Sequence, residues 1–221
     1  GDFDKLFELI EKMRSLKGQA GFNRVDIKMR IFLTTHYFEL LAYERMGDFS
    51  KALNMMEGIN DQLNSFGEKL TKEDEVVFDH MFANIYFGAG KYREALRRIN
   101  NVLNDNESNL RQDIYSFSKL FNLVIHFELE NFDLLDYLIK STERYYVKKK
   151  KDAKVGYEFE VEFIKHFKKL IKAVRNLNDK SEAFLEMRNG LRKLLKNEDE
   201  RVALEYFDYI TWVEANIQNR P

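Results

Sequence analysis

Apolar residues recur three and four positions apart along most of this chain, which is the spacing of one face of an α-helix. The first such face is formed by Phe3, Leu6, Ile10 and Met13. No convincing stretch alternates apolar and polar residues in the manner of a half-buried strand. The pattern predicts roughly ten helices, at residues 3–16, 24–46, 49–66, 71–87, 92–103, 110–129, 132–148, 153–174, 178–196 and 199–217.

Residues that break helices are scarce. The single proline is Pro221, and the chain has 10 glycines. Because a proline inside a helix costs about 3 kcal/mol, a proline-free interior permits long helices. Gly47 follows one periodic segment and is expected to end it in the left-handed conformation. Thr71, with Asp74 three residues later, resembles a capping box that begins another helix. We therefore expect an all-α fold.

A short phrase recurs where one expected helix gives way to the next. It reads Gly-Asp-Phe-Ser-Lys-Ala-Leu at 47–53, Gly-Lys-Tyr-Arg-Glu-Ala-Leu at 90–96, and more faintly Glu-Asn-Phe-Asp-Leu-Leu at 130–135. Its aromatic residues are 43 and then 40 positions apart. Self-similarity at such a period is typical of an array of stacked helical hairpins.

The segment 76–109 resembles a tetratricopeptide repeat, a unit of about 34 residues made of two antiparallel helices. Glu107 stands where that family has a terminal proline. The small residues of such a repeat let its helices approach closely, and the aromatic residues fill the seam between repeats. The positions that match the family are Ala83, Tyr86, Gly90, Tyr92, Ala95 and Leu96.

The units on either side keep this pattern less completely. Leu40 replaces the small residue of the first unit, although Tyr43, Gly47, Phe49, Ala52 and Leu53 keep the phrase. In the third unit, His126, Glu130 and Leu135 replace the family's tyrosine, turn glycine and packing alanine.

The resemblance covers about residues 33–140, and the phrases at 111–115 and 129–135 are similar to those of uncharacterised tetratricopeptide-like proteins of Bacteroidetes. It implies one domain over 1–221, an α-solenoid of antiparallel helical hairpins in which 141–221 form degenerate capping helices. The first residues are Gly1-Asp2 without a methionine, so we expect Gly1 to be a tag remnant and a longer native protein.

The family's peptide groove is lined by the first helix of each pair. The positions that line the groove in the family correspond to Tyr37, Leu41, Glu44, His80, Asn84 and Phe87 in the first two units. In the third unit, the corresponding helix contains the candidates Arg111, Asp113, Tyr115, Asn122 and His126. Some family members clamp a carboxylate with lysines and asparagines there. Only Asn84 fits that set, so we do not expect the clamp. The alternative for these positions is a structural role, because aromatic residues at helical spacing also form cores.

The net charge of −1 hides an uneven distribution. Residues 140–196 hold 17 Lys and Arg against 8 Asp and Glu. One interpretation is a basic patch interleaved with aromatic residues that contacts phosphates. The alternatives are solvated lysine faces, or a complement to an acidic surface of the same protein or of a neighbouring subunit. Since arginines are few and no nucleic-acid module is recognisable, we do not expect nucleic acid as a partner. The patch would comprise Lys148, Lys149, Lys150, Lys151, Lys165 and Lys169.

Signals for catalysis or for cofactors are nearly absent from the sequence. There is no cysteine, which excludes disulfides, zinc–thiolate sites and a cysteine nucleophile. No glycine-rich phosphate loop or nucleophile elbow is present. Glu162 and His166 are four apart and could share a helix face, but two ligands are too few for a closed metal site. The most apolar stretch, 120–129, is interrupted by Asn122, His126 and Glu128 and is too short to span a bilayer. We expect no enzyme activity, cofactor, metal or membrane.

These observations favour a non-catalytic scaffold that binds a protein or peptide along the concave face of the array. The alternative is a sensory or regulatory domain of a protein whose missing N-terminal part binds nucleic acid. The lack of cysteine suits the cytoplasm, where we expect the protein. Whether it forms a homo-oligomer stays open at this point.

Overall fold

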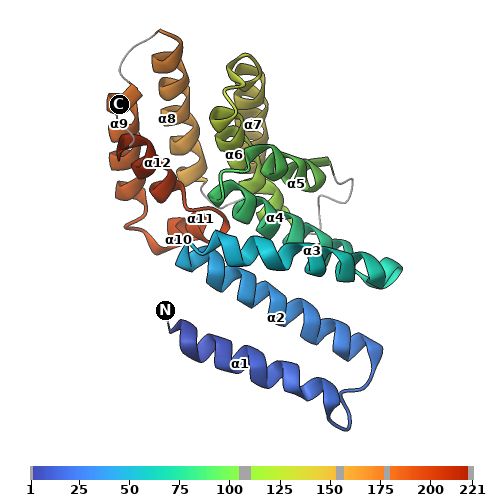
Figure 1. The fold of residues 1–221 in the computed structure, drawn as a ribbon. Coiled ribbons are helices and arrows are strands. Elements are labelled where there is room, and N and C mark those ends of the chain that lie inside the picture. The colour runs from blue at the N-terminus through green and yellow to red at the C-terminus, as the bar shows by residue number, and fades with distance from the viewer. Residues whose placement is uncertain (1, 105–110, 153–156, 177–179, 219–221) are drawn as a thin grey trace. The chain divides into compact units, whose positions relative to one another are not determined.

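In the computed structural model, the described residues are 2–104, 111–152, 157–176 and 180–218, without the side chains of 151 and 152. Within these ranges the chain is helical and contains no strand (Figure 1). This confirms the all-α fold. Helices that follow one another along the chain pack against one another, which is consistent with an all-α helical repeat or solenoid.

The described part contains ten helices of ten residues or more, together with shorter helical segments. The expected helix starts at 110, 153 and 178 lie outside the described residues. The elements are α1 (Phe3–Ser15), η1 (Leu16–Gly18), α2 (Val25–Met46), α3 (Phe49–Phe66), η2 (Gly67–Lys69), α4 (Lys72–Gly88), α5 (Tyr92–Asn104), α6 (Gln112–Glu128), α7 (Phe132–Asp152), α8 (Glu158–Arg175), α9 (Lys180–Leu194), α10 (Glu198–Arg201), α11 (Ala203–Tyr206) and α12 (Tyr209–Gln218).

The prediction of one continuous helix over 199–217 is wrong, because this segment is broken into α10, α11 and α12. Val202 separates α10 from α11 with backbone angles that are still helical, and the larger break lies at Phe207, whose backbone is extended, with φ −161° and ψ 139°. Its buried ring stacks on Phe121 with ring centroids 4.3 Å apart. Asp208 then begins α12, since its carboxylate accepts from the Thr211 N–H at 3.0 Å and from the Thr211 hydroxyl at 2.7 Å. A capping side chain therefore replaces helix continuation.

The chain divides into two compact units, Gly1–Ile114 and Tyr115–Pro221, which are described separately. In the first unit, α2 packs on α1, α3 and α4, and α4 packs on α3 and α5. This division does not test whether the chain forms one domain over 1–221, so that expectation stays a prediction. The core of this unit is formed mainly by α2, α3 and α4, through Leu33, Leu40, Ala52, Met56, Ile59, Leu63, Phe78, Met81, Phe82 and Ile85.

The second unit has a core of aromatic rings. Its helix α8 packs on α7 and α9, and α9 packs on α12. The Phe127 ring is central, because rings from four different helices surround it at centroid distances of 5.8–6.0 Å. These rings belong to Phe132, Phe167, Phe184 and Trp212.

The recurring phrase forms the same turn three times. Gly47, Gly90 and Glu130 all have positive φ, at 71°, 72° and 56°. In each turn the next residue donates its N–H to a carbonyl of the preceding helix, over 2.9, 2.8 and 3.0 Å respectively. This left-handed residue with its backward hydrogen bond is the usual C-terminal cap of a helix. The expectation for Gly47 is thus confirmed, and the faint third phrase is structurally equivalent to the other two.

The aromatic residue of the first phrase explains a glycine in the next hairpin. A Cβ atom added to Gly88, at the end of α4, would lie 2.2 Å from ring atoms of Phe49. That distance is far inside van der Waals contact, so a larger residue at position 88 would displace the ring. Phe49 of one turn therefore packs against the following hairpin through a position where only glycine fits.

We expect Glu130→Gly to raise the free energy of unfolding by about 1 kcal/mol. The left-handed conformation costs a residue with a Cβ atom about 1–2 kcal/mol. Glycine avoids this cost, but it also increases the conformational entropy of the unfolded chain, which offsets part of the stabilisation. Urea denaturation followed by circular dichroism measures the change. The matched control is Gly90→Ala, which should lower stability by a similar amount. Equal stability of all three proteins would contradict this account of the turn.

Candidate functional site

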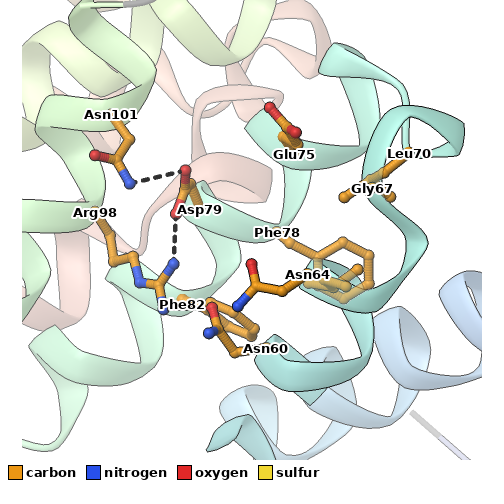
Figure 2. A pocket seen from close by; sticks show the side chains of 11 residues that line it. Asn60, Asn64, Gly67, Leu70, Glu75, Phe78, Asp79, Phe82, Arg98 and Asn101 are labelled. Atoms are coloured by element: carbon orange, nitrogen blue, oxygen red, sulfur yellow. Dashed lines mark hydrogen bonds and ion pairs between the residues drawn. The ribbon is translucent and has the colours of Figure 1, made fainter. Parts of the chain in front are cut away.

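The first unit contains an open pocket of about 330 Å³ between α3, α4 and α5 (Figure 2). Polar side chains line it, and aromatic and aliphatic side chains contribute the rest of its wall. The lining residues are Asn60, Leu63, Asn64, Gly67, Leu70, Glu75, Phe78, Asp79, Phe82, Arg98 and Asn101.

Helical spacing explains why these residues meet. On α4, Glu75, Phe78, Asp79 and Phe82 lie at positions i, i+3, i+4 and i+7, and therefore share one face. On α5, the buried residues Ala95, Ile99 and Val102 anchor the helix in the core. This places Arg98 and Asn101, each one position before a buried residue, at the side of that anchoring face.

An ion pair between α4 and α5 organises the pocket. Arg98 Nη1 lies 2.9 Å from Asp79 Oδ1, and Nη2 donates to Asn60 Oδ1 on α3 at 2.8 Å. The Asn101 amide donates to the second Asp79 oxygen at 3.1 Å (Figure 2). One arginine thus connects three helices. Its guanidinium also lies over the Phe82 ring, 4.8 Å from the centroid, within the range of a cation–π contact.

The Asp79 and Arg98 side chains are largely withdrawn from water, with exposed fractions of 17% and 18%. Burial raises the pKa of the Asp79 carboxyl, although the hydrogen bonds from Arg98 and Asn101 act in the opposite direction. Arg98 Nε is buried and has no hydrogen-bond partner among the described residues. The pair therefore presents a fixed polar surface whose charges are already matched.

The carboxamides give the pocket its binding chemistry. Asn60 uses its oxygen to accept from Arg98, which leaves its NH₂ group as a donor. Asn64 is exposed on the same helix and lines the pocket one turn later. A carboxamide carries both donors and an acceptor, so it can pair with a peptide N–H and a peptide C=O alike. The pocket is suited to hydrogen-bond a polypeptide segment.

The groove candidates of the first unit lie elsewhere, since none of them lines this pocket. Tyr37 and Leu41 are partly buried and pack against the core of the unit. Glu44 is half-buried. On α4, His80 and Asn84 are buried, with 6% and 7% of their surface exposed.

The remaining groove candidates have contacts within their own surroundings. Half-buried Phe87 lies against the Tyr92 ring, with centroids 5.0 Å apart. Arg111 forms two hydrogen bonds to the Asp113 carboxylate, at 3.0 and 2.6 Å. Tyr115 contacts the Tyr145 ring at 5.8 Å. The assignment of all these positions to a groove stays a prediction.

His126 and its neighbour Glu128 have structural contacts in the second unit. His126 is buried, and its Nδ1 accepts from the Asn131 amide at 3.0 Å. Burial lowers the pKa of His126. Glu128 accepts from the Trp212 indole at 2.7 Å and from the Asn216 amide at 3.3 Å. Glu128 is partly exposed, and its carboxylate also binds two side chains of α12.

The lysines of the expected basic patch are divided between two helices of the second unit. Lys148, Lys149 and Lys150 lie on α7, where Lys149 Nζ is 5.8 Å from the centre of the Tyr145 ring. The Lys151 side chain lies outside the described residues. On α8, both patch lysines have carboxylate partners, and the role of the patch stays a prediction. Lys165 bonds to Glu162 at 2.8 Å, and Lys169 bonds to Glu186 of α9 at 2.7 Å.

Glu162 and His166 do share a helix face, with His166 Nε2 3.1 Å from Glu162 Oε1. Nε2 also lies only 2.3 Å from the place of a Cβ on Gly190, so α9 closes over the ring. Across the described residues, no group of three or more His, Cys, Asp or Glu side chains is arranged to hold a metal ion.

The sequence reasoning missed the pocket residues Asn60, Asn64, Asp79, Arg98 and Asn101. Family offsets direct attention to another face of α4, and Asp79 and Arg98 are 19 positions apart. One sequence feature does point to them: two expected helices joined by a short turn carry an acidic and a basic residue, each next to the buried face of its helix.

No protein-family model matches the chain, and no curated protein or solved structure matches it either. Of the helices in the described ranges, none combines the length and the apolar character needed to cross a membrane.

Proposed function

We propose that this protein is a non-catalytic scaffold of tetratricopeptide-like helical hairpins that binds a protein or peptide partner. The observation that carries the proposal is the carboxamide-lined pocket between α3, α4 and α5. We also propose a cytoplasmic location, which rests on the composition of the chain alone.

The arrangement of the pocket supports binding better than it supports catalysis. Its acid and base, Asp79 and Arg98, are hydrogen-bonded to each other and to two asparagines. A general acid or base needs access to a substrate proton. Here both groups serve to hold the pocket walls in place. A rigid wall with preformed polar groups reduces the ordering cost of binding.

The aromatic residues behind these polar groups support the same proposal. Phe78 and Phe82 are core residues of the unit, with 3% and 1% of their surface exposed, yet both line the pocket. They provide an apolar floor to the pocket. A partner side chain that enters the pocket would lose water against this floor, while its backbone pairs with Asn60, Asn64 or Asn101. This combination of an apolar floor and a polar rim is usual for peptide sites.

We expect Asn64→Ala to weaken peptide binding about fivefold. One hydrogen bond contributes about 1 kcal/mol, which corresponds to roughly that factor in affinity. The probe is a set of peptides selected from a random phage-displayed library on the full chain, with each affinity measured by fluorescence anisotropy. Asn64 is exposed, so its replacement should leave the fold intact.

The matched control is Asn54→Ala, a change of the same kind at an exposed position of the same helix, away from the pocket lining. Affinity should be unchanged in this variant. A library that yields no binder, or binders that Asn64→Ala and Asn54→Ala affect equally, would refute the pocket as the binding site.

A further inference from the structure

The second unit contains a separate cavity of about 360 Å³ between α7 and α8. It takes no part in the function proposed above. Basic side chains dominate its walls, with four Lys or Arg residues against two carboxylates. The lining residues are Asp136, Ile139, Lys140, Glu143, Lys168, Ile171, Lys172, Arg175 and Asn176.

An ion pair between the two helices lines each end of this cavity. Lys168 Nζ of α8 lies 2.6 Å from Glu143 of α7. Arg175 of α8 pairs with Asp136 of α7 and also donates to the Phe132 carbonyl. The paired positions are seven residues apart on both helices, which is about 10 Å along a helix axis. The two carboxylates therefore limit the cavity on both sides.

Two lysines between these ion pairs have no carboxylate partner in the part of the chain that the structure describes. Lys140 of α7 and Lys172 of α8 are both exposed, and neither forms an ion pair with a described residue. Between them lie Ile139 and Ile171, which are 3% exposed and form an apolar base. The centre of the cavity is thus a short positive site on an apolar surface, whereas its ends are neutral.

We propose that this cavity binds a compact dianion on an apolar body, either a phosphate monoester or a dicarboxylate. Two unpaired ammonium groups match two negative charges, and the volume lies in the range of small-ligand sites. A long polyanion such as a nucleic acid fits less well, because the positive site is short and the ion pairs at its ends are neutral. Most phosphates of such a chain would therefore have no cationic partner. The site would take a small molecule or one modified side chain.

The test is a titration of the full chain followed by the backbone amide signals in NMR spectra. The probes are phenyl phosphate and phthalate, with benzyl alcohol as an uncharged comparison. We expect at least one of the two dianions to shift the amide signals of residues 136–143 and 168–176 at millimolar concentrations, and benzyl alcohol to leave them unchanged. A response to phenyl phosphate alone assigns the phosphate monoester, and a response to phthalate alone assigns the dicarboxylate.

The variant Lys140→Gln/Lys172→Gln should weaken this binding about tenfold, as expected for the loss of two partly screened charge contacts. The matched control is Lys193→Gln/Lys196→Gln, which removes the same charge from two exposed lysines of the same unit that do not line the cavity. The control should bind like the wild type.

The proposal is overturned if neither dianion shifts these signals, or if both double variants bind equally. It is also overturned if a single-stranded oligonucleotide binds more tightly than both probes and the Lys140/Lys172 variant abolishes that binding, because the site would then be a nucleic-acid site. Asn64→Ala should leave dianion binding unchanged, so failure here and failure of the peptide pocket are separable.

Discussion

Replacing Glu160 with glutamine is expected to raise the free energy of unfolding by about 3 kcal/mol at pH 8, and by only about 1 kcal/mol at pH 5. Glu160 lies on α8 and is 6% exposed. Burial, together with the nearby Glu200 carboxylate, raises its pKa from 4.5 to about 7. Ionisation of this carboxyl in the folded protein is therefore costly, and a neutral amide of the same shape avoids that cost.

The sign follows from proton binding. Between about pH 4.5 and pH 7 the folded protein keeps the Glu160 proton, whereas the unfolded chain releases it. The folded state binds more protons in this window, so its stability falls as the pH rises and then stays level above pH 7. Glutamine does not titrate. The glutamine variant should therefore lose this part of the pH dependence, which urea denaturation at a series of pH values measures.

Titratable groups of three other helices lie near enough to Glu160 to be coupled to it electrostatically. The charge of Glu160 helps to raise the pKa of the buried tyrosines Tyr146 of α7 and Tyr209 of α12, and the Glu200 carboxylate of α10 helps to raise the pKa of Glu160. Glu200 in turn accepts from the Phe159 N–H at 2.8 Å and so caps the start of α8. The charge on Glu160 thus acts where three other helices meet α8.

Glu162→Gln is the control on the same helix. The hydrogen bond from Lys165 lowers the pKa of Glu162, so this carboxylate is stabilised in the folded state. Its replacement should slightly reduce stability at neutral pH, the opposite sign to Glu160. If Glu160→Gln kept the pH dependence of the wild type, the carboxyl would not be buried as described.

Trp212→Ala is expected to lower the free energy of unfolding of the second unit by about 4 kcal/mol, a usual cost of removing a buried aromatic side chain. Its indole packs against Phe184, Phe127 and Phe167 at centroid distances of 5.6, 5.8 and 6.2 Å. It also donates to Glu128 at 2.7 Å, so the variant removes a hydrogen bond that ties α12 to α6.

Circular dichroism must follow this unfolding, because Trp212 is the single tryptophan and the variant has no indole fluorescence. The control is Phe38→Ala, an aromatic truncation at a side chain that is 41% exposed, which should cost less than about 1 kcal/mol. A cost for Trp212→Ala as small as that of Phe38→Ala would mean that α12 does not close the aromatic core.

The local architecture could be predicted because its causes are local. Helix-forming periodicity, the left-handed Gly47 and the capping Thr71 act over a few residues, and the structure has each of them, with the Thr71 hydroxyl accepting from the Asp74 N–H at 3.1 Å. Even the faint phrase at Glu130 adopts the expected turn. The break at Phe207 is an exception, because the apolar periodicity of 199–217 predicts an uninterrupted helix, whereas the Asp208 side chain caps a new one.

The candidate sites could not be predicted in the same way, because they depend on residues far apart in the chain. Asn60 and Arg98 are 38 positions apart, and Asp136 and Arg175 are 39 apart. Pairs of this kind form only when whole helices pack in one particular register. Lys168 and Lys169 are neighbours in the sequence, yet one pairs with α7 and the other with α9.

Interactions within a few positions of the chain specify most of the helices and the kind of residue that each turn needs, so these features can be predicted from the sequence alone. Which polar side chains meet, and which are removed from water, depends on how distant parts of the chain pack together. Glu160 and Glu162 belong to the same helix and carry the same carboxyl group, but burial raises the pKa of the first and a lysine lowers that of the second. The difference comes from what the rest of the chain packs around each of them.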